Sequence, residues 1–575
     1  MGCQRRAAGR LGQAVGSLCV GASVTPYTST LQAMQSAEQK LGSHAPHRRR
    51  AWRWFALPVV FIGYLACAEL FGPASRFRHA DLVVIAGALL GVPASILLAI
   101  ALRQGLSHAR TLFSSLKWWH WLWALTVVSA LTWRIRAASE IASEPVDAWA
   151  AARIGMDVVL AFVLLCRLTL RRTEWLGSML RGLVGALTVF GMVCLASTAW
   201  SVFPPWTLFK SCEYLVDIAL LAAILESLDS PEEFRNLFNW TWTLYGGLLL
   251  SVWLGTIVWP HEAFYGQVLQ RGAALESRLQ GVLPAISSND VGTYAAILGL
   301  VSLARLFPAS EERFHKPWYV LLLLGSLVTM VLAQTRTAFA GFAFGGFFIL
   351  LYSKRGKLGP LLTFVVAPTL ALATMGGLVW SFFERGQTEA QLATLSSRAQ
   401  WWASAWQTFL ERPLTGFGAY AAGRFAVLAK LGLGETSTLH SDYLDVLVGT
   451  SIWGMIPFIV ALLGTWWLLL RYVRNSSSNP QAHQLAYEGL VVLALLTFRS
   501  VFMTMLTWHP PLHFLAILGY AEYVRRRRRA LIRVKVRQLS DLQVEYPDPQ
   551  LELVFETRYP AISFGARPPA EEESP

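Results

Sequence analysis

The stretch SRAQWWASAWQTFLERPLTGFGAYAAGRFAVLAKLGLGETSTLHSDYL, residues 397–444, decides how the rest of the chain is interpreted. It is the main part of a longer polar stretch, residues 384–445, that lies between two apolar segments of membrane length. Connections in compact helical bundles are usually only about 2 to 8 residues long. A connection of this size requires a reason, and we expect it to form a loop with a function of its own.

The composition is that of a membrane protein. Hydrophobic residues make up 54% of the 575 residues and charged residues only 15%, which lies outside the balance of a soluble chain. We predict an all-α polytopic membrane protein, a bundle of about 12–14 transmembrane helices of roughly 20 residues each, with one large periplasmic loop that contains amphipathic helices. The expected spans lie near residues 52–71, 81–102, 118–133, 150–170, 179–197, 207–225, 239–259, 291–307, 318–333, 337–352, 360–382, 451–470, 487–506 and 512–524.

The distribution of basic residues predicts the topology. Arginines and lysines cluster at the ends of alternate apolar segments, as the positive-inside bias requires. If the arginines at 48–50 are cytoplasmic, those at 525–529 are cytoplasmic too, and the loop at residues 384–445 lies outside. We expect a disordered cytoplasmic tail at residues 1–50, a transmembrane domain at residues 51–530 and a second cytoplasmic tail at residues 531–575.

The same charge pattern narrows the choice of partners. The net charge of +14 is spread over these short clusters, which argues for contact with membrane lipid and against a nucleic-acid partner. None of the six cysteines falls in the large polar loop, so neither a disulfide framework nor a cysteine metal site is expected there.

Two arginines stand at the outer ends of apolar segments. Arg336 lies at the tip of an apolar hairpin, where a charge must face water or find a partner; the alternative is an interfacial arginine that snorkels to the headgroups. Arg398 opens a segment in which Trp402, Trp406 and Phe409 recur at helical spacing, which predicts a helix lying on the membrane surface. Its alternative is a solvated charge beside an aromatic anchor.

His440 lies just before the chain enters the next apolar segment. A histidine there can accept a proton from a hydroxyl near neutral pH, although a lone histidine in a loop is more often only a polar residue. Together with Arg336 and Arg398 it indicates more, because two guanidinium groups suit phosphate oxygens and can stabilise a departing pyrophosphate without a metal. The three residues predict transfer of a group from a lipid pyrophosphate to an alcohol, with no cofactor.

Several short motifs follow one another through this part of the chain. They are Arg278-Leu279-Gln280-Gly281, Ser288-Asn289, Thr335-Arg336-Thr337-Ala338, Ser397-Arg398, Trp402, Pro413-Leu414-Thr415-Gly416-Phe417-Gly418, Phe425, His440-Ser441, Tyr443-Leu444, Gly449 and Gly454. Their order and topology over residues 278–454 resemble the O-antigen ligase and polymerase superfamily of bacterial inner-membrane proteins. Ser441 and Thr335 replace the asparagine and serine that are commoner there, which bears on substrate detail more than on the reaction.

The resemblance implies residue roles and a reaction. The arginines matching Arg336 and Arg398 are associated with the undecaprenyl-pyrophosphate donor, and the histidine matching His440 with activation of the acceptor hydroxyl. It implies inverting, metal-independent glycan transfer on the periplasmic face of the inner (cytoplasmic) membrane. A ligase would use a sugar hydroxyl of lipid A core as acceptor, an O-antigen or exopolysaccharide polymerase would use a growing glycan, and protein O-glycosylation would follow the same chemistry. Arg278 and Asn289 match the family and are expected as further donor contacts.

Other polar residues in apolar surroundings leave alternatives open. Arg499, toward the outer side of its span, is expected to add charge to the donor site. Lys210, Glu213 and Asp217 share one helix face; we interpret them first as a structural network, with a proton or ion path as the alternative. An anion or lipid-glycan transporter is the competing class, but transporters often show inverted repeats, and we find no convincing repeat in this sequence.

Overall fold

The computed structural model describes residues 103–545, with gaps at 108–109, 111–115, 132–137, 145, 171–174, 267–276, 311–315, 355–356, 385–386, 388–397, 434–437 and 476–478. These residues belong to the second of two compact units, Leu89–Pro575. The expected tail at residues 1–50 and the spans at 52–71 and 81–102 lie outside the described residues, as does the end of the chain after residue 545.

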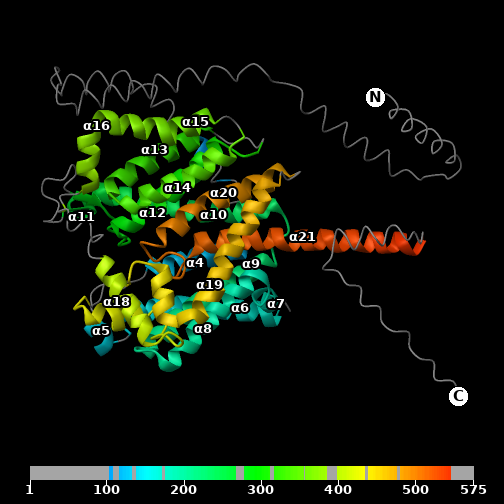
Figure 1. Cartoon of the computed structure of the whole chain (residues 1–575), viewed down its shortest axis with the longest axis horizontal. Coiled ribbons are helices and arrows are strands. Elements are labelled where there is room, and N and C mark those ends of the chain that lie inside the picture. Colours follow the sequence, from blue (N-terminus) through cyan, green and yellow to red (C-terminus); the bar gives the residue numbers. More distant parts are fainter. Residues whose placement is uncertain are drawn as a thin grey trace, which may run out of the picture. The chain divides into compact units, whose positions relative to one another are not determined.

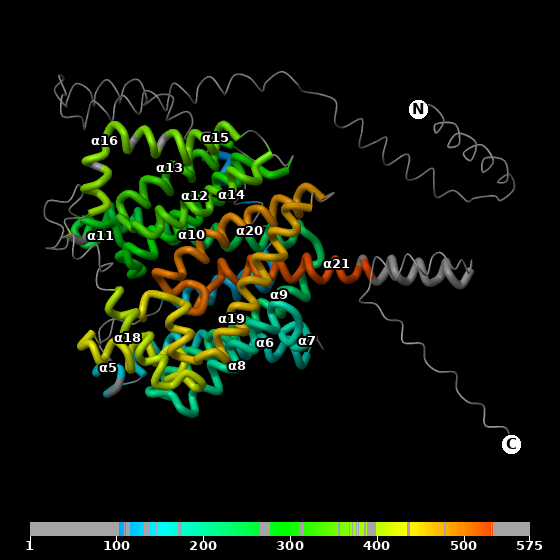
Figure 2. Tube along the Cα trace, in the orientation of Figure 1, coloured from blue at the N-terminus to red at the C-terminus, as the bar shows by residue number. Residues whose placement is uncertain are grey.

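Helices make up almost all of the described secondary structure (Figure 1, Figure 2). The exception is a pair of short antiparallel strands, β1 (Phe264–Gly266) and β2 (Ser277–Leu279). The helices are α4 (Trp118–Leu131), α5 (Ala138–Ser143), α6 (Ala148–Leu170), α7 (Trp175–Met179), α8 (Gly182–Ala196), η1 (Ser197–Trp200), α9 (Pro204–Leu225), α10 (Pro231–Val258), α11 (Pro260–Ala263), α12 (Ser288–Leu306), α13 (Lys316–Ala333), α14 (Arg336–Tyr352), α15 (Leu358–Leu361), η3 (Leu362–Val366), α16 (Ala367–Glu384), α18 (Arg398–Glu411), η4 (Ala422–Leu428), α19 (Asp442–Arg474), α20 (Pro480–Arg499) and α21 (Leu512–Glu545).

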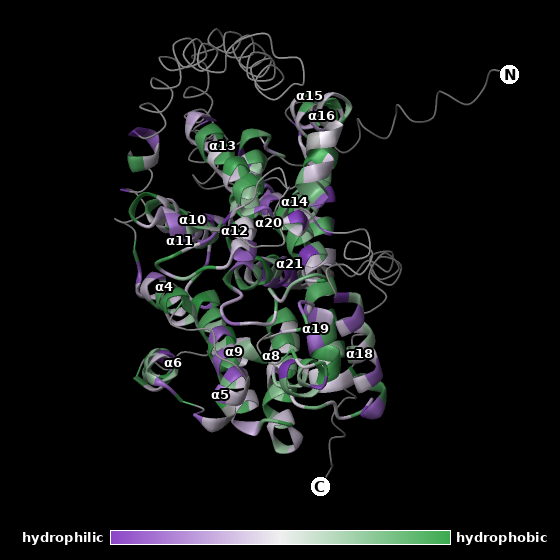
Figure 3. Ribbon diagram, turned by 90° about the vertical axis from the view of Figure 1, so that its left-hand side faces the viewer, coloured by the Kyte–Doolittle hydropathy of each residue, from purple (hydrophilic) through white to green (hydrophobic). Residues whose placement is uncertain are grey.

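This architecture confirms the predicted all-α polytopic membrane protein. Within the described residues, five helical segments are long and apolar enough to cross a membrane: Ala148–Leu170, Gly182–Trp200, Pro231–Val258, Lys316–Ala333 and Asp442–Arg474. Hydrophobic residues cover most of the length of α8, α13 and α14, whereas α18 is mixed (Figure 3). Other expected spans coincide with helices that are shorter or that bury charged groups, such as α14 and α9.

One expected boundary was wrong. The span predicted at residues 487–506 is a helix that begins earlier, at Pro480, and ends at Arg499, so the apolar residues 501–506 form part of a loop. The last helix, α21, begins at the expected start of its span, Leu512, and continues past residue 524 to Glu545, so residues 531–545 are helical.

Helix α19 contains a kink that receives the large polar loop. Ser451 has non-helical backbone angles (φ 58°, ψ −155°) within it. The carbonyls of Val448 and Gly449, just before the kink, accept hydrogen bonds from the amides of Phe417 and Gly418, each at 3.0 Å. Gly416 has a φ of +68°, and a Cβ there would lie 2.5 Å from the Gly449 carbonyl oxygen, so only glycine fits this docking point. The kink therefore ties the loop after α18 to α19.

The described helices pack as neighbours in a bundle (Figure 1). Contacts join α12 to α13 and α14, α14 to α20, α20 to α19, and α19 to α8. In the view of Figure 1, α5, α11 and α18 lie at the left end of these helices, while α7 and the projecting part of α21 lie at the right end. The two ends of the bundle thus carry different sets of connecting elements.

A buried ion pair and its hydrogen-bond partners join four of these helices. Arg305 of α12 donates to Glu488 of α20 through Nε at 2.8 Å and through a terminal nitrogen at 2.7 Å. The same carboxylate accepts from Trp242 Nε1 of α10 at 2.6 Å, and Arg305 also donates to the Tyr319 hydroxyl at 2.9 Å. Both charged side chains are buried. Breaking such a pair leaves an uncompensated charge in a low-dielectric interior.

We therefore expect Glu488→Ala to lower the free energy of unfolding by about 3–5 kcal/mol. The matched control is Glu411→Ala, which breaks the pair between Glu411 and Lys430, both side chains of which are about half exposed, and should cost between about 0 and 1 kcal/mol. Denaturant unfolding of the purified protein in one detergent measures both. Equal losses for the two variants would contradict the role given to the buried pair.

Candidate active site

Arg336 is the first residue of α14, and the turn before it is fixed to two other elements. The preceding Gln334 has a φ of 50°, and its side-chain amide donates to the Ser277 carbonyl in β2 at 2.7 Å. The Thr335 hydroxyl donates to the Ser288 carbonyl at the start of α12 at 3.0 Å. The beginnings of α14 and α12 and strand β2 are thereby held together.

Arg278 reaches the same place from the small sheet. It lies in β2, opposite Tyr265 of β1, and is partly buried. Burial lowers the pKa of Arg336, and the positive charge of Arg278 lowers it further. The Arg336 guanidinium also donates to the side-chain oxygen of Gln387. The guanidinium group of strand β2 therefore acts on the one at the start of α14.

Arg398 brings the amphipathic helix into this group. It is the first residue of α18, which buries Ala405 and Thr408 and packs against α19 and η4. Burial lowers the pKa of Arg398, and the charge of Arg336 lowers it further. Within the described residues, neither Arg336 nor Arg398 forms an ion pair with a carboxylate. In this part of the chain, Arg336 and Arg398 therefore bring two guanidinium groups close together without a carboxylate paired to either.

His440 lies beside Arg398. Its ring stacks on Trp401 of α18, with centroids 5.8 Å apart, and its φ of 54° places it in the left-handed region. The preceding residue, Leu439, is fixed on both sides: Trp402 Nε1 donates to its carbonyl at 3.2 Å, and its amide donates to the Asp445 carboxylate at 3.3 Å. Burial, then the charges of Arg398 and Arg499, lower the pKa of His440 to about 4. The imidazole is therefore neutral near pH 7.

Arg499 contacts the beginnings of α12 and α14. It is fully buried at the end of α20. Its terminal nitrogens donate to the Asn289 carbonyl at 2.7 Å and to the Thr337 hydroxyl at 3.1 Å, while its buried Nε has no partner among the described residues. Asn289 thus joins the site through its main chain. Arg499 clamps the starts of α12 and α14 together.

Asp442, which the sequence reasoning did not single out, fixes the start of α19. Its amide donates to the Ser500 carbonyl at 2.9 Å. Its carboxylate accepts from the amides of Met505, Leu506 and Thr507 at 2.7, 3.0 and 3.1 Å and from the Thr507 hydroxyl at 2.6 Å. The pattern Ser441-Asp442 before an apolar run is typical of a helix N-terminus, so the sequence predicts the cap but not this distant loop.

Four helices therefore begin around one place: α12, α14, α18 and α19. The free amides of a helix N-terminus carry partial positive charge and favour anions. Electrostatic interactions link these residues in series there: Arg278 acts on Arg336, Arg336 on Arg398, and Arg398 and Arg499 on His440. Such an arrangement can hold an anion with several oxygens and place a neutral base beside it.

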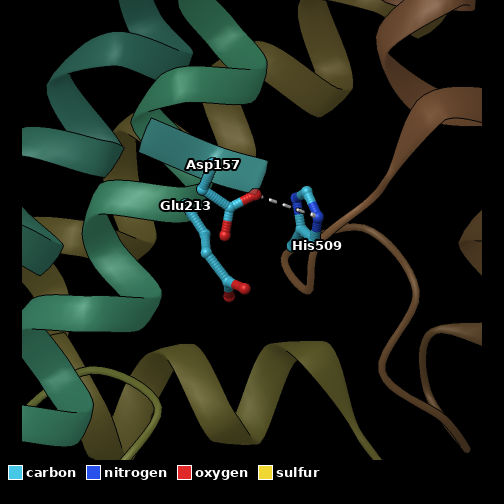
Figure 4. A group of neighbouring side chains, drawn as sticks. All are labelled: Asp157, Glu213 and His509. Atoms are coloured by element: carbon cyan, nitrogen blue, oxygen red, sulfur yellow. Dashed lines mark ion pairs between the residues drawn. The ribbon is translucent and has the colours of Figure 1, made fainter. Parts of the chain in front are cut away.

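The Lys210, Glu213 and Asp217 group is a separate cluster with more members than expected. Glu213 accepts from Lys210 at 2.7 Å and from Arg153 of α6 at 2.5 Å, whereas Asp217 pairs with His509 Nδ1 at 2.7 Å. Within the described residues, the grouping that could hold a metal ion is Asp157, Glu213 and His509 (Figure 4). It contains none of the residues predicted for the donor site.

Comparison with known families bears on the segment that contains this geometry. Residues 320–459 match the family model described as O-antigen ligase. The predicted resemblance to the O-antigen ligase superfamily is confirmed. The matched segment runs from α13 into α19 and includes Arg336, Arg398 and His440. It supports a membrane enzyme of the glycan ligase or polymerase type. No curated protein matches the chain.

The lowered pKa of His440 predicts a pH dependence of stability. Because the pKa is 6.5 before burial and about 4 in the folded protein, acidification through this window protonates the unfolded state first and lowers stability. We expect the free energy of unfolding of the wild type to fall more steeply between pH 6.5 and pH 4 than that of His440→Asn. Asparagine suits the comparison because it tolerates the positive φ. Parallel profiles would contradict the neutral, buried imidazole.

Proposed function

We propose that the protein moves a glycan from undecaprenyl pyrophosphate to a sugar hydroxyl of lipid A core, at the periplasmic face of the bacterial inner membrane. The observation that carries the proposal is the electrostatic contact of Arg336, Arg398 and His440 within the segment that matches the O-antigen ligase family. Residues far apart in the sequence supply two cations, neither of which pairs with a carboxylate among the described residues, and a neutral base beside them.

The proposed reaction is a single displacement at the anomeric carbon of the donor. A ring nitrogen of His440 takes the proton of the acceptor hydroxyl, and the acceptor oxygen forms the new bond to the anomeric carbon with inversion. The bond from that carbon to the pyrophosphate oxygen breaks, and undecaprenyl pyrophosphate leaves with the electron pair. Arg336 and Arg398 stabilise the negative charge that develops on it.

The low pKa of His440 fits this sequence of events. Without a donor, the charges of Arg398 and Arg499 disfavour the imidazolium. A bound pyrophosphate brings negative charge into the same place and offsets the arginines, so it raises the pKa of the base. A base whose pKa moves toward the operating pH is more effective in proton transfer. Donor binding would thus activate the residue that accepts the proton.

The arrangement of the connecting elements supports the proposed sidedness. The charge pattern assigns α5, α11 and α18 to the outer face and α7 and the end of α21 to the cytoplasm. In Figure 1 the first three lie at one end of the bundle and the last two at the other. The proposed site, at the beginning of α18, is at the end assigned to the periplasm, where lipid-linked glycans would be joined to their acceptors.

We expect Arg336→Gln and Arg398→Gln each to lower glycan transfer at least about 100-fold, because each removes a charge from the leaving pyrophosphate. His440→Asn should lower it about 100-fold or more through loss of the base. The control is Arg412→Gln directly after the end of α18, an exposed arginine over the Phe417 ring, which should remain near wild type. Transfer to purified lipid A core by membranes with equal protein levels measures all four. Full activity in the first three variants would remove the catalytic assignment.

A polymerase would share the donor chemistry and differ in the acceptor, so a second prediction separates the two. Deletion of the gene from its own bacterium should leave free long glycan chains and bare lipid A core on analysis of the surface glycan by gel electrophoresis. The core has then lost its ligase. Single repeat units attached to the core would instead indicate a polymerase.

A further inference from the structure

A second buried group of charges lies between α6, α9 and the loop before α21 (Figure 4). Arg153 and Asp157 come from α6, Glu213 from α9 together with its neighbours Lys210 and Asp217, and His509 from the loop. Asp157 also accepts from the Ser129 hydroxyl of α4 at 2.8 Å. The proposed transfer reaction uses none of these residues. Burying several charged side chains costs desolvation free energy, so the group calls for a separate explanation.

With His509 neutral, the formal charges of this group sum to one net negative charge. Arg153 and Lys210 are cations, and Asp157, Glu213 and Asp217 are three carboxylates. Both cations donate to Glu213, one to each oxygen, which leaves two carboxylates to share whatever positive charge remains. One further positive charge makes the network neutral.

His509 lies between those two carboxylates. Its Nδ1 is 2.7 Å from Asp217 Oδ2, and its Nε2 is 4.0 Å from Asp157 Oδ1. The side chain is buried, and Nε2, Asp157 Oδ2 and Asp217 Oδ1 are buried atoms without partners among the described residues. An imidazolium has a donor on each ring nitrogen, so protonation would give Asp217 a hydrogen bond and place the second N–H 4.0 Å from Asp157, within ion-pair distance.

A metal ion is the other way to supply positive charge. Asp157, Glu213 and His509 each offer a ligand atom, all within 4.8 Å of one another. However, both Glu213 oxygens already accept from Arg153 and Lys210. A divalent ion there would lie against two cations and would leave the group with excess positive charge. A proton supplies the single charge that is lacking, and the contacts favour it.

The loop that carries His509 also holds the start of α19. The amides of Met505, Leu506 and Thr507 donate to Asp442, two residues after His440. Tyr214 of α9 fastens the same loop by donating from its hydroxyl to the Leu506 carbonyl at 3.0 Å. The contacts that hold His509 in place therefore also hold the backbone amides that bind the Asp442 carboxylate.

We propose that His509 is a positioning residue, held as an imidazolium between Asp217 and Asp157. It completes a buried ion network that fixes the loop whose amides bind Asp442. Because Asp442 lies two residues after His440, this loop sets the position of His440. The ion network and the loop stand on their own contacts. The consequence for His440 rests on the function proposed above.

Electrostatics agree with this state. Burial would lower the pKa of His509, but the carboxylate of Asp217, which also accepts its hydrogen bond, and then Glu213 raise it above its ordinary value. A raised folded-state pKa gives stability that is complete below the unfolded value and is lost as pH rises through the folded value. Asp157, Glu213, Asp217, Arg153 and Lys210 are the charged groups that face this ring.

The experiment compares hydrogen exchange of the 505–507 amides in the full-length protein at pH 6.5 by mass spectrometry. His509→Gln leaves three carboxylates against two cations, so exchange should become about tenfold faster. His509→Gln with Asp157→Asn restores the balance and keeps an acceptor for Ser129, so exchange should return toward wild type. In parallel, the thermal midpoint of the wild type should fall as pH rises from 6 to 9, and that of His509→Gln should not follow it.

Three results would overturn the proposal. They are unchanged exchange in His509→Gln, faster exchange in the double variant than in the single one, and faster wild-type exchange on chelation that Zn²⁺ reverses. The last two would indicate a bound cation, because the double variant lacks two of its ligands. None of these measurements depends on glycan transfer, so a failure of the proposed function would appear separately in the transfer assay.

Discussion

Like charges held near one another in a half-buried site are the constraint on which the rest of this structure depends. Arg278 acts on Arg336, Arg336 acts on Arg398, and Arg398 acts on His440, each disfavouring the protonated form of its neighbour. Four helix N-termini add partial positive charge at the same place. The mutual repulsion of such a cluster raises its free energy when no ligand is bound, and a bound anion offsets this repulsion. The scaffold must therefore be rigid enough to keep the charges together without the ligand. The chemistry of the site follows from the anion whose binding offsets their repulsion.

Two buried polar residues provide that rigidity. Arg499 joins the beginnings of α12 and α14 through Asn289 and Thr337. Asp442 joins the beginning of α19 to the loop after α20. Neither needs to touch a substrate to matter, because a small misplacement of reacting groups is enough to slow a reaction strongly. The buried Arg305 and Glu488 pair fixes α12 against α20, so the helix that carries Asn289 and the helix that carries Arg499 cannot slide past each other without breaking it.

Much of this arrangement could be predicted from hydropathy, charge and motif order, and the remainder depended on contacts between distant residues. The apolar segments predicted the helices, and the motifs around Arg336, Arg398 and His440 predicted the residues that the structure gathers. Residues 501–506 were wrongly assigned to a helix because they are apolar, whereas three amides from Met505 to Thr507 go to Asp442 instead of a helical turn. The kink at Ser451 was missed because it accompanies hydrogen bonds from the distant residues Phe417 and Gly418, which the local sequence does not reveal. The spacing of Lys210, Glu213 and Asp217 indicated that they share one face of a helix. It could not indicate that His509, far along the sequence, pairs with Asp217.

The central claim is that Arg336 and Arg398 form the binding site of a lipid-linked diphosphate. The most direct test is equilibrium binding of undecaprenyl pyrophosphate to the purified protein in lipid nanodiscs, at two salt concentrations, for the wild type and for Arg398→Gln. We expect binding that weakens with salt and falls at least about tenfold in the variant, because a charge-assisted bond to phosphate is lost. Equal affinity in both proteins, unaffected by salt, would contradict it.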